Sequence, residues 1–323
     1  MLTAVILFIV GLVLLIKGGD WFVDGAVHIA QHFHLPELLI GATVVSIGTT
    51  LPEVMVSATS ALTGHSEIAY GNAIGSVICN TALIAAVTVA VRPGEVRRKD
   101  LTLPICFFFA AALFYAGIAY TGGSFSRLDG VLLLLIFVVY MVLTVRRMTG
   151  PGRSESEETK AEEESSFRLS NDVFLLIFGA ALIAVGADLL VDNGTLIAQA
   201  LGMPESVIAL TFVALGTSLP ELVTAITSLI KGHGSLSLGN VIGANLFNLV
   251  LVLGIAVTLQ PFNIPVSSTL FGYNASLVLD IPVMLFVMLF LTIPALVREK
   301  LSRVQGVVLL VVYFSYCAIQ FAM

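Results

Sequence analysis

Ten apolar runs, each of roughly 20 residues or more, divide the sequence and limit what it can fold into. A helix of that length crosses the ~30 Å hydrocarbon core of a bilayer. Only helices and closed barrels satisfy all their backbone polar groups in that environment. The sequence therefore predicts an all-α polytopic membrane protein with ten transmembrane helices. The expected spans are residues 2–30, 35–62, 66–91, 101–120, 125–146, 172–200, 204–230, 235–259, 275–297 and 304–322.

The composition agrees with this class of protein. Apolar residues make up 58% of the chain and charged residues 11%, which excludes an ordinary soluble domain. The net charge of −6 comes largely from acids in one segment, so no nucleic-acid partner is expected. Cys79, Cys106 and Cys317 lie in apolar runs at unrelated spacings. They predict neither a disulfide nor a metal site, and nothing in the chain indicates a cofactor.

Residues 148–171 form the longest hydrophilic segment and separate the fifth apolar run from the sixth. Proline, glycine, serine and acidic residues dominate the segment, as is typical of a linker. This predicts a first five-helix half at 1–147 and a second at 172–323. The alternative is that the acidic linker is a regulatory ion-binding loop.

The basic residues predict the orientation of the chain in the membrane. All but two of the 15 lysine and arginine residues, the exceptions being Lys17 and Arg127, fall in or near loops on the face that carries the linker. Basic residues accumulate on the cytoplasmic side of membrane proteins. We therefore expect a cytoplasmic linker, two extracytoplasmic termini and a multi-pass protein of the cell membrane.

The two halves repeat each other. Displacing the sequence by 168 positions aligns them without a gap. Because each half has an odd number of spans, the second half must enter the membrane from the opposite side. Such inverted repeats are typical of secondary transporters that bind their substrate between the halves. The matched pairs include Asp20 with Asp188, Asp24 with Asp192, Pro36 with Pro204, Glu37 with Glu205, Glu53 with Glu221 and Asn80 with Asn248.

The most unusual repeated segment is GTTLPE at 48–53, which returns as GTSLPE at 216–221. A proline inside a helix cannot donate to the carbonyl four residues earlier. Pro52 and Pro220 are therefore expected to free the carbonyls of Gly48 and Gly216. Hydroxyl side chains and one glutamate adjoin each proline. Each motif thus offers only oxygen ligands.

Glu53 and Glu221 need a partner if they lie within the bilayer. A charged side chain at mid-bilayer costs about 3 kcal/mol on insertion scales, and the spans that carry and follow these motifs contain no lysine or arginine. Carboxylate, hydroxyl, amide and carbonyl oxygens suit Ca²⁺, and they also suit Na⁺. We therefore expect a shared cation site. The alternative is that both glutamates are protonated and serve only in helix packing.

The span after each motif carries a second repeated block, GNAIGSVICN at 71–80 and GNVIGANLFN at 239–248. Ser76 and Asn80 are four residues apart and share a helix face, as do Ala244 and Asn248. Small residues at this spacing allow helices to approach closely. The blocks predict either a stripe of ligands facing the glutamates or a close-packed interface without ligands.

In these paired blocks the chain resembles the calcium/cation antiporter superfamily, specifically its sodium/calcium exchanger branch with its prokaryotic members. The resemblance spans nearly the whole chain and implies exchange of Na⁺ for Ca²⁺ by alternating access, in a monomer of a prokaryotic plasma or inner membrane. It implies Ca²⁺ ligation by Glu53, Glu221, Thr49 and Thr217, the threonines through their carbonyls. Sodium sites would use Ser46, Thr50, Glu53, Ser76, Ala214, Ser218 and Glu221, with Asn80 and Asn248 lining the centre.

Two positions depart from the pattern of the resembling family. Asn248 stands where potassium-dependent relatives tend to have an acid, which favours potassium independence. Ala244 stands where a serine is expected, which predicts that one sodium site lacks a hydroxyl ligand. Its symmetry-related position, Ser76, keeps the serine. We hypothesise that the Ser46 hydroxyl, which faces Ala244 in that site, replaces the missing ligand.

Three other functions compete with sodium/calcium exchange. A proton- or potassium-coupled exchanger would use the same fold, although the repeat signature of the proton-coupled branch is absent. A cation channel requires a continuous pore, whereas inverted repeats favour alternating access. An intramembrane enzyme with Glu53 and Glu221 as an acid–base pair would need an activated nucleophile that the motifs do not supply.

Overall fold

The computed structural model describes residues 2–149, 162–200, 216, 218–266 and 269–322. Within them, nine helices are long and apolar enough to cross a membrane, and a shorter apolar helix covers Leu219–Ile230. The expected span 204–230 is thus described in its second part only, because 201–215 and 217 lie outside the described residues. The all-helical, multi-pass architecture that the apolar runs predict is confirmed.

The first half contains five such spans. The second and third are each interrupted by a short π-helix, labelled η. The elements are α1 (Leu2–His32), α2 (Glu37–Ile40), η1 (Gly41–Val45), α3 (Ser46–Leu62), α4 (Ser66–Cys79), η2 (Asn80–Ala85), α5 (Ala86–Val91), α6 (Arg98–Thr121), β1 (Ser124–Phe125) and α7 (Arg127–Thr149).

The second half follows the same plan. Its elements are α8 (Glu162–Ala200), α10 (Leu219–Ile230), α11 (Gly234–Phe247), η4 (Asn248–Val252), α12 (Leu253–Leu259), β2 (Phe262–Asn263), β3 (Thr269–Leu270), β4 (Tyr273–Asn274), η5 (Ser276–Asp280), α13 (Ile281–Arg298) and α14 (Arg303–Ala322). Strand β1 pairs with β2, and β3 with β4, each in antiparallel register.

Several helix boundaries coincide between the halves under the displacement of 168 positions, although those of α6 and α7 do not match those of α13 and α14. α4 and α11 begin and end at equivalent residues, and η2 and η4 both begin at the repeated asparagine, Asn80 or Asn248. Gly64 and Gly232, also equivalent, both have positive φ, +82° and +91°. The repeated sequence thus produces a repeated local structure.

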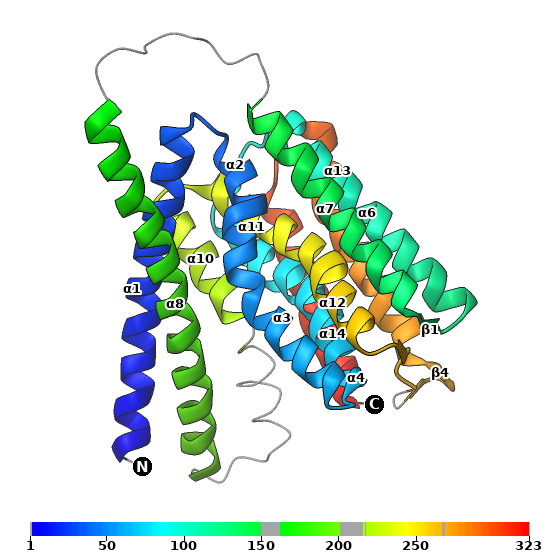
Figure 1. Cartoon of the computed structure of the whole chain (residues 1–323). Coiled ribbons are helices and arrows are strands. Elements are labelled where there is room, and N and C mark those ends of the chain that lie inside the picture. The colour runs from blue at the N-terminus through cyan, green and yellow to red at the C-terminus, as the bar shows by residue number, and fades with distance from the viewer. Residues whose placement is uncertain (1, 150–161, 201–215, 217, 267–268, 323) are drawn as a thin grey trace.

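Helices α1 and α8 form a long pair that stands beside the remaining helices (Figure 1). Glycines let the two backbones touch. A Cβ at Gly11 would lie 2.8 Å from the Gly186 carbonyl oxygen, and one at Gly18 would lie 2.9 Å from that of Gly179. We call these two helices the α1–α8 pair.

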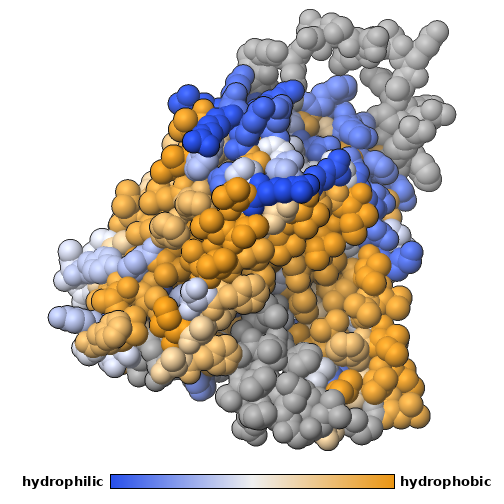
Figure 2. Space-filling view, turned by 180° about the vertical axis from the view of Figure 1, so that it is seen from behind, coloured by the Kyte–Doolittle hydropathy of each residue, from blue (hydrophilic) through white to orange (hydrophobic). Residues whose placement is uncertain are grey.

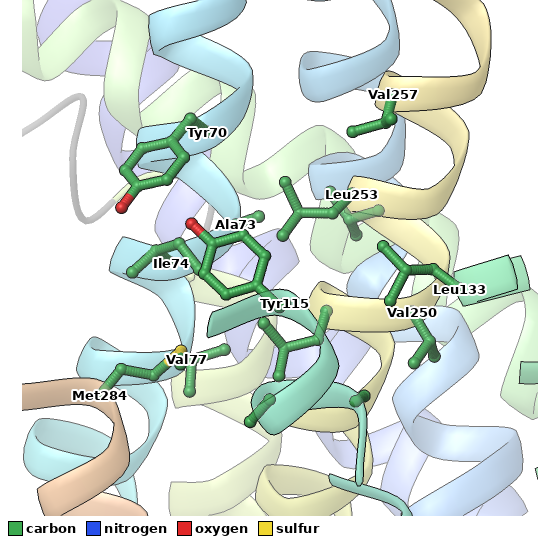
Figure 3. Close-up of a cluster of buried hydrophobic side chains, with 14 of the residues drawn as sticks. Tyr70, Ala73, Ile74, Val77, Tyr115, Leu133, Val250, Leu253, Val257 and Met284 are labelled. Atoms are coloured by element: carbon green, nitrogen blue, oxygen red, sulfur yellow. The ribbon is translucent and has the colours of Figure 1, made fainter. Parts of the chain in front are cut away.

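The main apolar core lies among the other helices. Tyr70, Tyr115, Leu133, Leu253 and Met284, from α4, α6, α7, α12 and α13, converge there (Figure 3). Within a bilayer such helices associate through van der Waals packing of these side chains rather than through removal of apolar surface from water. This core fixes α4 and α12 and, with them, the asparagines that begin η2 and η4.

The surface divides into an apolar belt and a polar end. Figure 2 shows hydrophilic residues gathered at one end, above a broad belt of hydrophobic ones. In Figure 1, α7 ends and α8 begins at that polar end, whereas both chain termini lie at the opposite end. This distribution is the one expected of a protein that spans a bilayer.

Candidate functional site

Two glutamates lie at the centre of the bundle. Glu53 in α3 and Glu221 in α10 are each 0% exposed. None of their four carboxylate oxygens has a hydrogen-bond partner among the described residues. The two carboxylates are also close enough to repel each other electrostatically. Two acids from the two halves thus lie together, buried and without a compensating group in the described part of the chain.

The two prolines act differently in the two halves. Helix α3 continues through Pro52, whereas α10 starts at Leu219 and has Pro220 in its first turn. Proline is well tolerated in a first turn because no intrahelical partner is needed there. The Gly216 carbonyl accepts the Leu219 N–H at 3.3 Å, so the prediction that Pro220 leaves this carbonyl free is wrong.

Hydroxyl side chains of α3 line the same interior. Thr49 is 2% exposed and lies beside the Glu221 carboxylate. Its hydroxyl donates to Asn240 Oδ1 at 3.2 Å. Thr50 is 0% exposed, and no described residue is a partner for its hydroxyl. The first half therefore presents the Thr49 hydroxyl next to the acid contributed by the second.

Ser46 is buried and joins η1 to α11. Its hydroxyl lies 2.7 Å from the Gly41 carbonyl oxygen and 2.9 Å from that of Asn240. A single hydroxyl hydrogen is therefore shared between two carbonyls, and the lone pairs of Ser46 Oγ remain available to an ion. Its equivalent in the second half, Ala214, lies outside the described residues, as does Thr217.

The asparagines occupy equivalent places at the start of two π-helices. Asn80 and Asn248 are both fully buried. Asn248 Nδ2 donates to the Ala244 carbonyl at 3.0 Å, while both side-chain atoms of Asn80 lack a partner among the described residues. Single π-helical turns often occur at functional sites because they shift side chains out of α-helical register.

The remaining sequence-predicted residues are also buried. Ser76 in α4 is 4% exposed and Ser218, just before α10, is 2% exposed. Ser218 and Glu221 both lie near Cys79, the residue that precedes Asn80. The structure thus brings Thr49, Ser218, Glu53 and Glu221 into one region.

Sequence reasoning missed two asparagines, Asn72 and Asn240. Asn72 Nδ2 donates to the Glu53 carbonyl oxygen at 3.2 Å and to Ser57 Oγ at 2.9 Å. Asn240 holds Thr49 and Ser46, as described above. Both follow the glycine that opens the second repeated block, and each is four residues before the stripe that starts at Ser76 or Ala244. That spacing was the available signal.

The α1–α8 pair closes one side of the site. A cavity of about 10 Å³ is lined by Phe22 of α1, Ala180 of α8, Thr49 and both motif prolines, Pro52 and Pro220. This space admits about one water-sized sphere. Any ion that leaves on this side must therefore pass between the pair and the other helices.

The chemistry of the site is that of a cation-binding centre. Its charge comes from two carboxylates, and its other groups are neutral oxygens and amides. Among the described residues, no cluster of three histidine, cysteine or acidic side chains could hold a transition metal. Within a bundle of membrane-length helices, buried acids of this kind are typical of the ion and proton pathways of transporters.

Comparison with known proteins identifies the family. A family model described as sodium/calcium exchanger protein matches residues 3–146 and 172–322. The sodium/calcium exchanger MaX1 of Methanosarcina acetivorans is 30% identical over 351 residues, covering 98% of both chains. An uncharacterized membrane protein of Methanocaldococcus jannaschii is 41% identical over 239 residues, covering 74% of this chain and 76% of that one.

Solved structures agree. One of the sodium-calcium exchanger NCX_Mj, soaked with Na⁺ and Sr²⁺, matches with a TM-score of 0.81 and 32% identity over 98% of both chains. The chain belongs to the sodium/calcium exchanger family. Its activity is antiport of sodium and calcium ions, and it is not an enzyme.

Proposed function

We propose that the protein extrudes calcium in exchange for sodium by alternating access, and that Glu53 and Glu221 together hold the transported ion. The observation that carries this proposal is the pair of fully buried carboxylates without a partner in the described residues. Two fixed negative charges are neutralised by one Ca²⁺ or by two Na⁺. Because the ions compete for the same carboxylates, each displaces the other, and exchange follows.

We infer the remaining ligands from the resemblance to the sodium/calcium exchanger branch. Thr49 and Thr217 complete the Ca²⁺ shell through their carbonyls, and Asn80 and Asn248 line the centre. Sodium sites combine the glutamates with neighbouring hydroxyl and carbonyl oxygens. Those sodium ligands are Ser46, Thr50, Ser76, Ala214 and Ser218.

A protein without a bound ion should change slowly between its two orientations. Without an ion, the two carboxylates would have to pass through a low-dielectric barrier uncompensated, which is costly. Only the ion-bound forms of the protein then reorient, and this suppresses uncoupled movement of either ion. Binding of more than two Na⁺ per Ca²⁺ makes the cycle electrogenic.

The proposed architecture is a pair of inverted five-helix repeats in a monomer of the cell membrane. The coincident helix boundaries of the two halves support the repeat. The basic residues near the polar end of the molecule support a cytoplasmic linker and extracytoplasmic termini. Alternating access would then move the α1–α8 pair against the other helices; binding-site occlusion is described for NCX_Mj.

Counterflow in vesicles tests the proposed function. We expect vesicles containing the protein to accumulate radioactive calcium only when an outward sodium gradient is imposed. Repeating the assay with outward potassium, lithium or proton gradients should give no accumulation. Calcium uptake that merely equilibrates, without need of a gradient, would indicate a channel, and uptake driven by potassium or protons would indicate the alternative coupling.

Ser46 is expected to compensate for Ala244 in one sodium site. Its hydroxyl oxygen keeps free lone pairs while its hydrogen is directed to the Gly41 and Asn240 carbonyls. Ser46→Ala should raise the sodium concentration for half-maximal exchange with little change in calcium affinity. Adding Ala244→Ser to this variant should return the sodium concentration for half-maximal exchange to its wild-type value. An unchanged sodium dependence, or a double variant without recovery, would assign Ser46 only to the η1–α11 contact.

A further inference from the structure

Lys231 joins the end of α10 to α1. Its Nζ donates to Asp24 Oδ1 at 2.8 Å and to the backbone carbonyl oxygen of Asp20 at 2.9 Å. The Asp20 carboxylate lies 3.5 Å from the same Nζ. The Lys231 side chain is only 24% exposed. One ammonium group thus lies among three oxygens of a single neighbouring helix.

Among the described residues, Lys231 forms the only ion pairs between the α1–α8 pair and the other helices. Helix α1 is held to α8 by the glycine contacts described above, and Figure 1 shows the α1–α8 pair beside the other helices. Helix α10 belongs to those others and carries Glu221, ten positions before Lys231. Near Lys231, α1 and α10 meet at Gly19, where a Cβ would press against Val223 and Thr227. A neutral van der Waals contact at a glycine resists the sliding of α1 along α10 less than an ion pair does.

The equivalent place in the other half keeps the acids and lacks the cation. Under the displacement of 168 positions, Asp20 and Asp24 correspond to Asp188 and Asp192 of α8, while Lys231 corresponds to Thr63. No ion pair to Asp188 or Asp192 occurs within the described residues.

The backbone is the same at both places, so the difference lies in the side chain. The residues that follow Thr63 and Lys231 are the positive-φ glycines Gly64 and Gly232 noted above. The turn between α3 and α4 and the turn between α10 and α11 therefore have the same backbone conformation, and only the second carries an ammonium group.

We propose that Lys231 is a positioning residue that holds the α1–α8 pair at its present place along α10 and thereby favours one of the two orientations of the transport cycle. This inference rests on the alternating-access function proposed above. A 2.8 Å contact does not survive a movement of α1 by several ångströms along α10. Since Thr63 offers no such contact at the opposite membrane face, the two orientations are not equally stabilised.

The test compares Lys231→Gln with Lys300→Gln. Lys300 also forms an ion pair, with Glu95 at 3.0 Å, but that pair joins two loops outside the α1–α8 pair. Half-saturating calcium concentrations are measured at each membrane face, in vesicles of defined orientation. Loss of the Lys231 contact should raise the half-saturating calcium concentration at one face and lower it at the other. The larger of the two changes should be about two- to fivefold, as expected for a partly exposed ion pair. Lys300→Gln should change neither.

A second measurement does not depend on transport. Amide hydrogen exchange of residues 20–31 in α1 should accelerate in Lys231→Gln and remain unchanged in Lys300→Gln. The exchanged pair, Lys231→Asp with Asp24→Lys, should restore both the hydrogen exchange and the calcium dependence at each face.

The outcomes separate this proposal from the function on which it rests. If wild-type vesicles show no sodium-driven calcium uptake, the proposed function fails, and hydrogen exchange still tests the contact. Lys231→Gln could instead change the half-saturating calcium concentration in the same direction at both membrane faces, or the exchanged pair could restore neither hydrogen exchange nor calcium dependence. In either case Lys231 has a merely structural role and the proposal is wrong.

Discussion

Sodium-driven calcium uptake should fall by a factor of 100 or more, at about 3 kcal/mol or more of lost interaction, when either Glu53 or Glu221 is replaced with glutamine. Each change removes half of the charge that holds a divalent ion and leaves the shape of the side chain nearly unchanged. Because a neutral amide is easier to bury than an unpaired carboxylate, the variants should remain folded and inserted. Radioactive calcium uptake and thermal unfolding in detergent measure the two effects.

Glu67→Gln is the matched control for these variants. Glu67 lies in the first turn of α4 and is exposed. Its replacement also removes one negative charge, from the same half of the chain as Glu53, and should leave uptake unchanged. Near-normal uptake by Glu53→Gln or by Glu221→Gln would contradict a site shared between both carboxylates. Added calcium should also raise the unfolding temperature of the wild type and of Glu67→Gln only, since a ligand stabilises the state that binds it.

A single methyl group on Gly239 should destabilise the protein strongly. Gly239 of α11 faces the backbone of α2, and a Cβ there would overlap the carbonyl oxygen of Leu38. Backbone atoms cannot move aside as a flexible side chain can. Gly239→Ala should therefore lower the free energy of unfolding by about 3 kcal/mol, and it should also disturb Asn240, the next residue. Thermal unfolding and retention of the folded protein on a sizing column provide the measurement.

Gly117→Ala is the matched control for the packing prediction. Gly117 lies in α6, and a Cβ there would meet no atom within 4 Å in the described structure. An alanine at this position also has the higher helix propensity, so stability should stay the same or rise slightly. If Gly239→Ala unfolds at the same temperature as Gly117→Ala, the close contact between α2 and α11 is not needed for the fold.

The sequence predicted the spans well because their signal is local. Nine long apolar helices in the described residues match runs that can be read directly from the chain, and α1 and α14 end within two residues of the predicted limits. The π-helices were not predicted. In spans that are apolar on nearly all sides, hydrophobic periodicity is too weak to reveal the shift in register that one wider turn produces.

The site could be predicted only in part. Glu53, Glu221 and the hydroxyls beside them stood out because acids and small polar groups are rare in apolar spans. Asn72 and Asn240 did not stand out, because their role depends on which carbonyl or hydroxyl a neighbouring helix brings near them. The contact of Lys231 with Asp24 joins residues 207 positions apart and depends on how α1 lies against α10.

The cavity beside Thr49 also bears on which divalent ion is rejected. This space of about 10 Å³ is lined mostly by apolar side chains, together with Thr49 and the two motif prolines, and it is too small for a hydrated ion. Calcium exchanges its water readily and tolerates an irregular set of oxygens, whereas magnesium gives up its water reluctantly and demands a near-ideal octahedron. An ion that passes here on its way to Glu53 and Glu221 must shed its water, and we therefore expect the cost of dehydration to discriminate against magnesium.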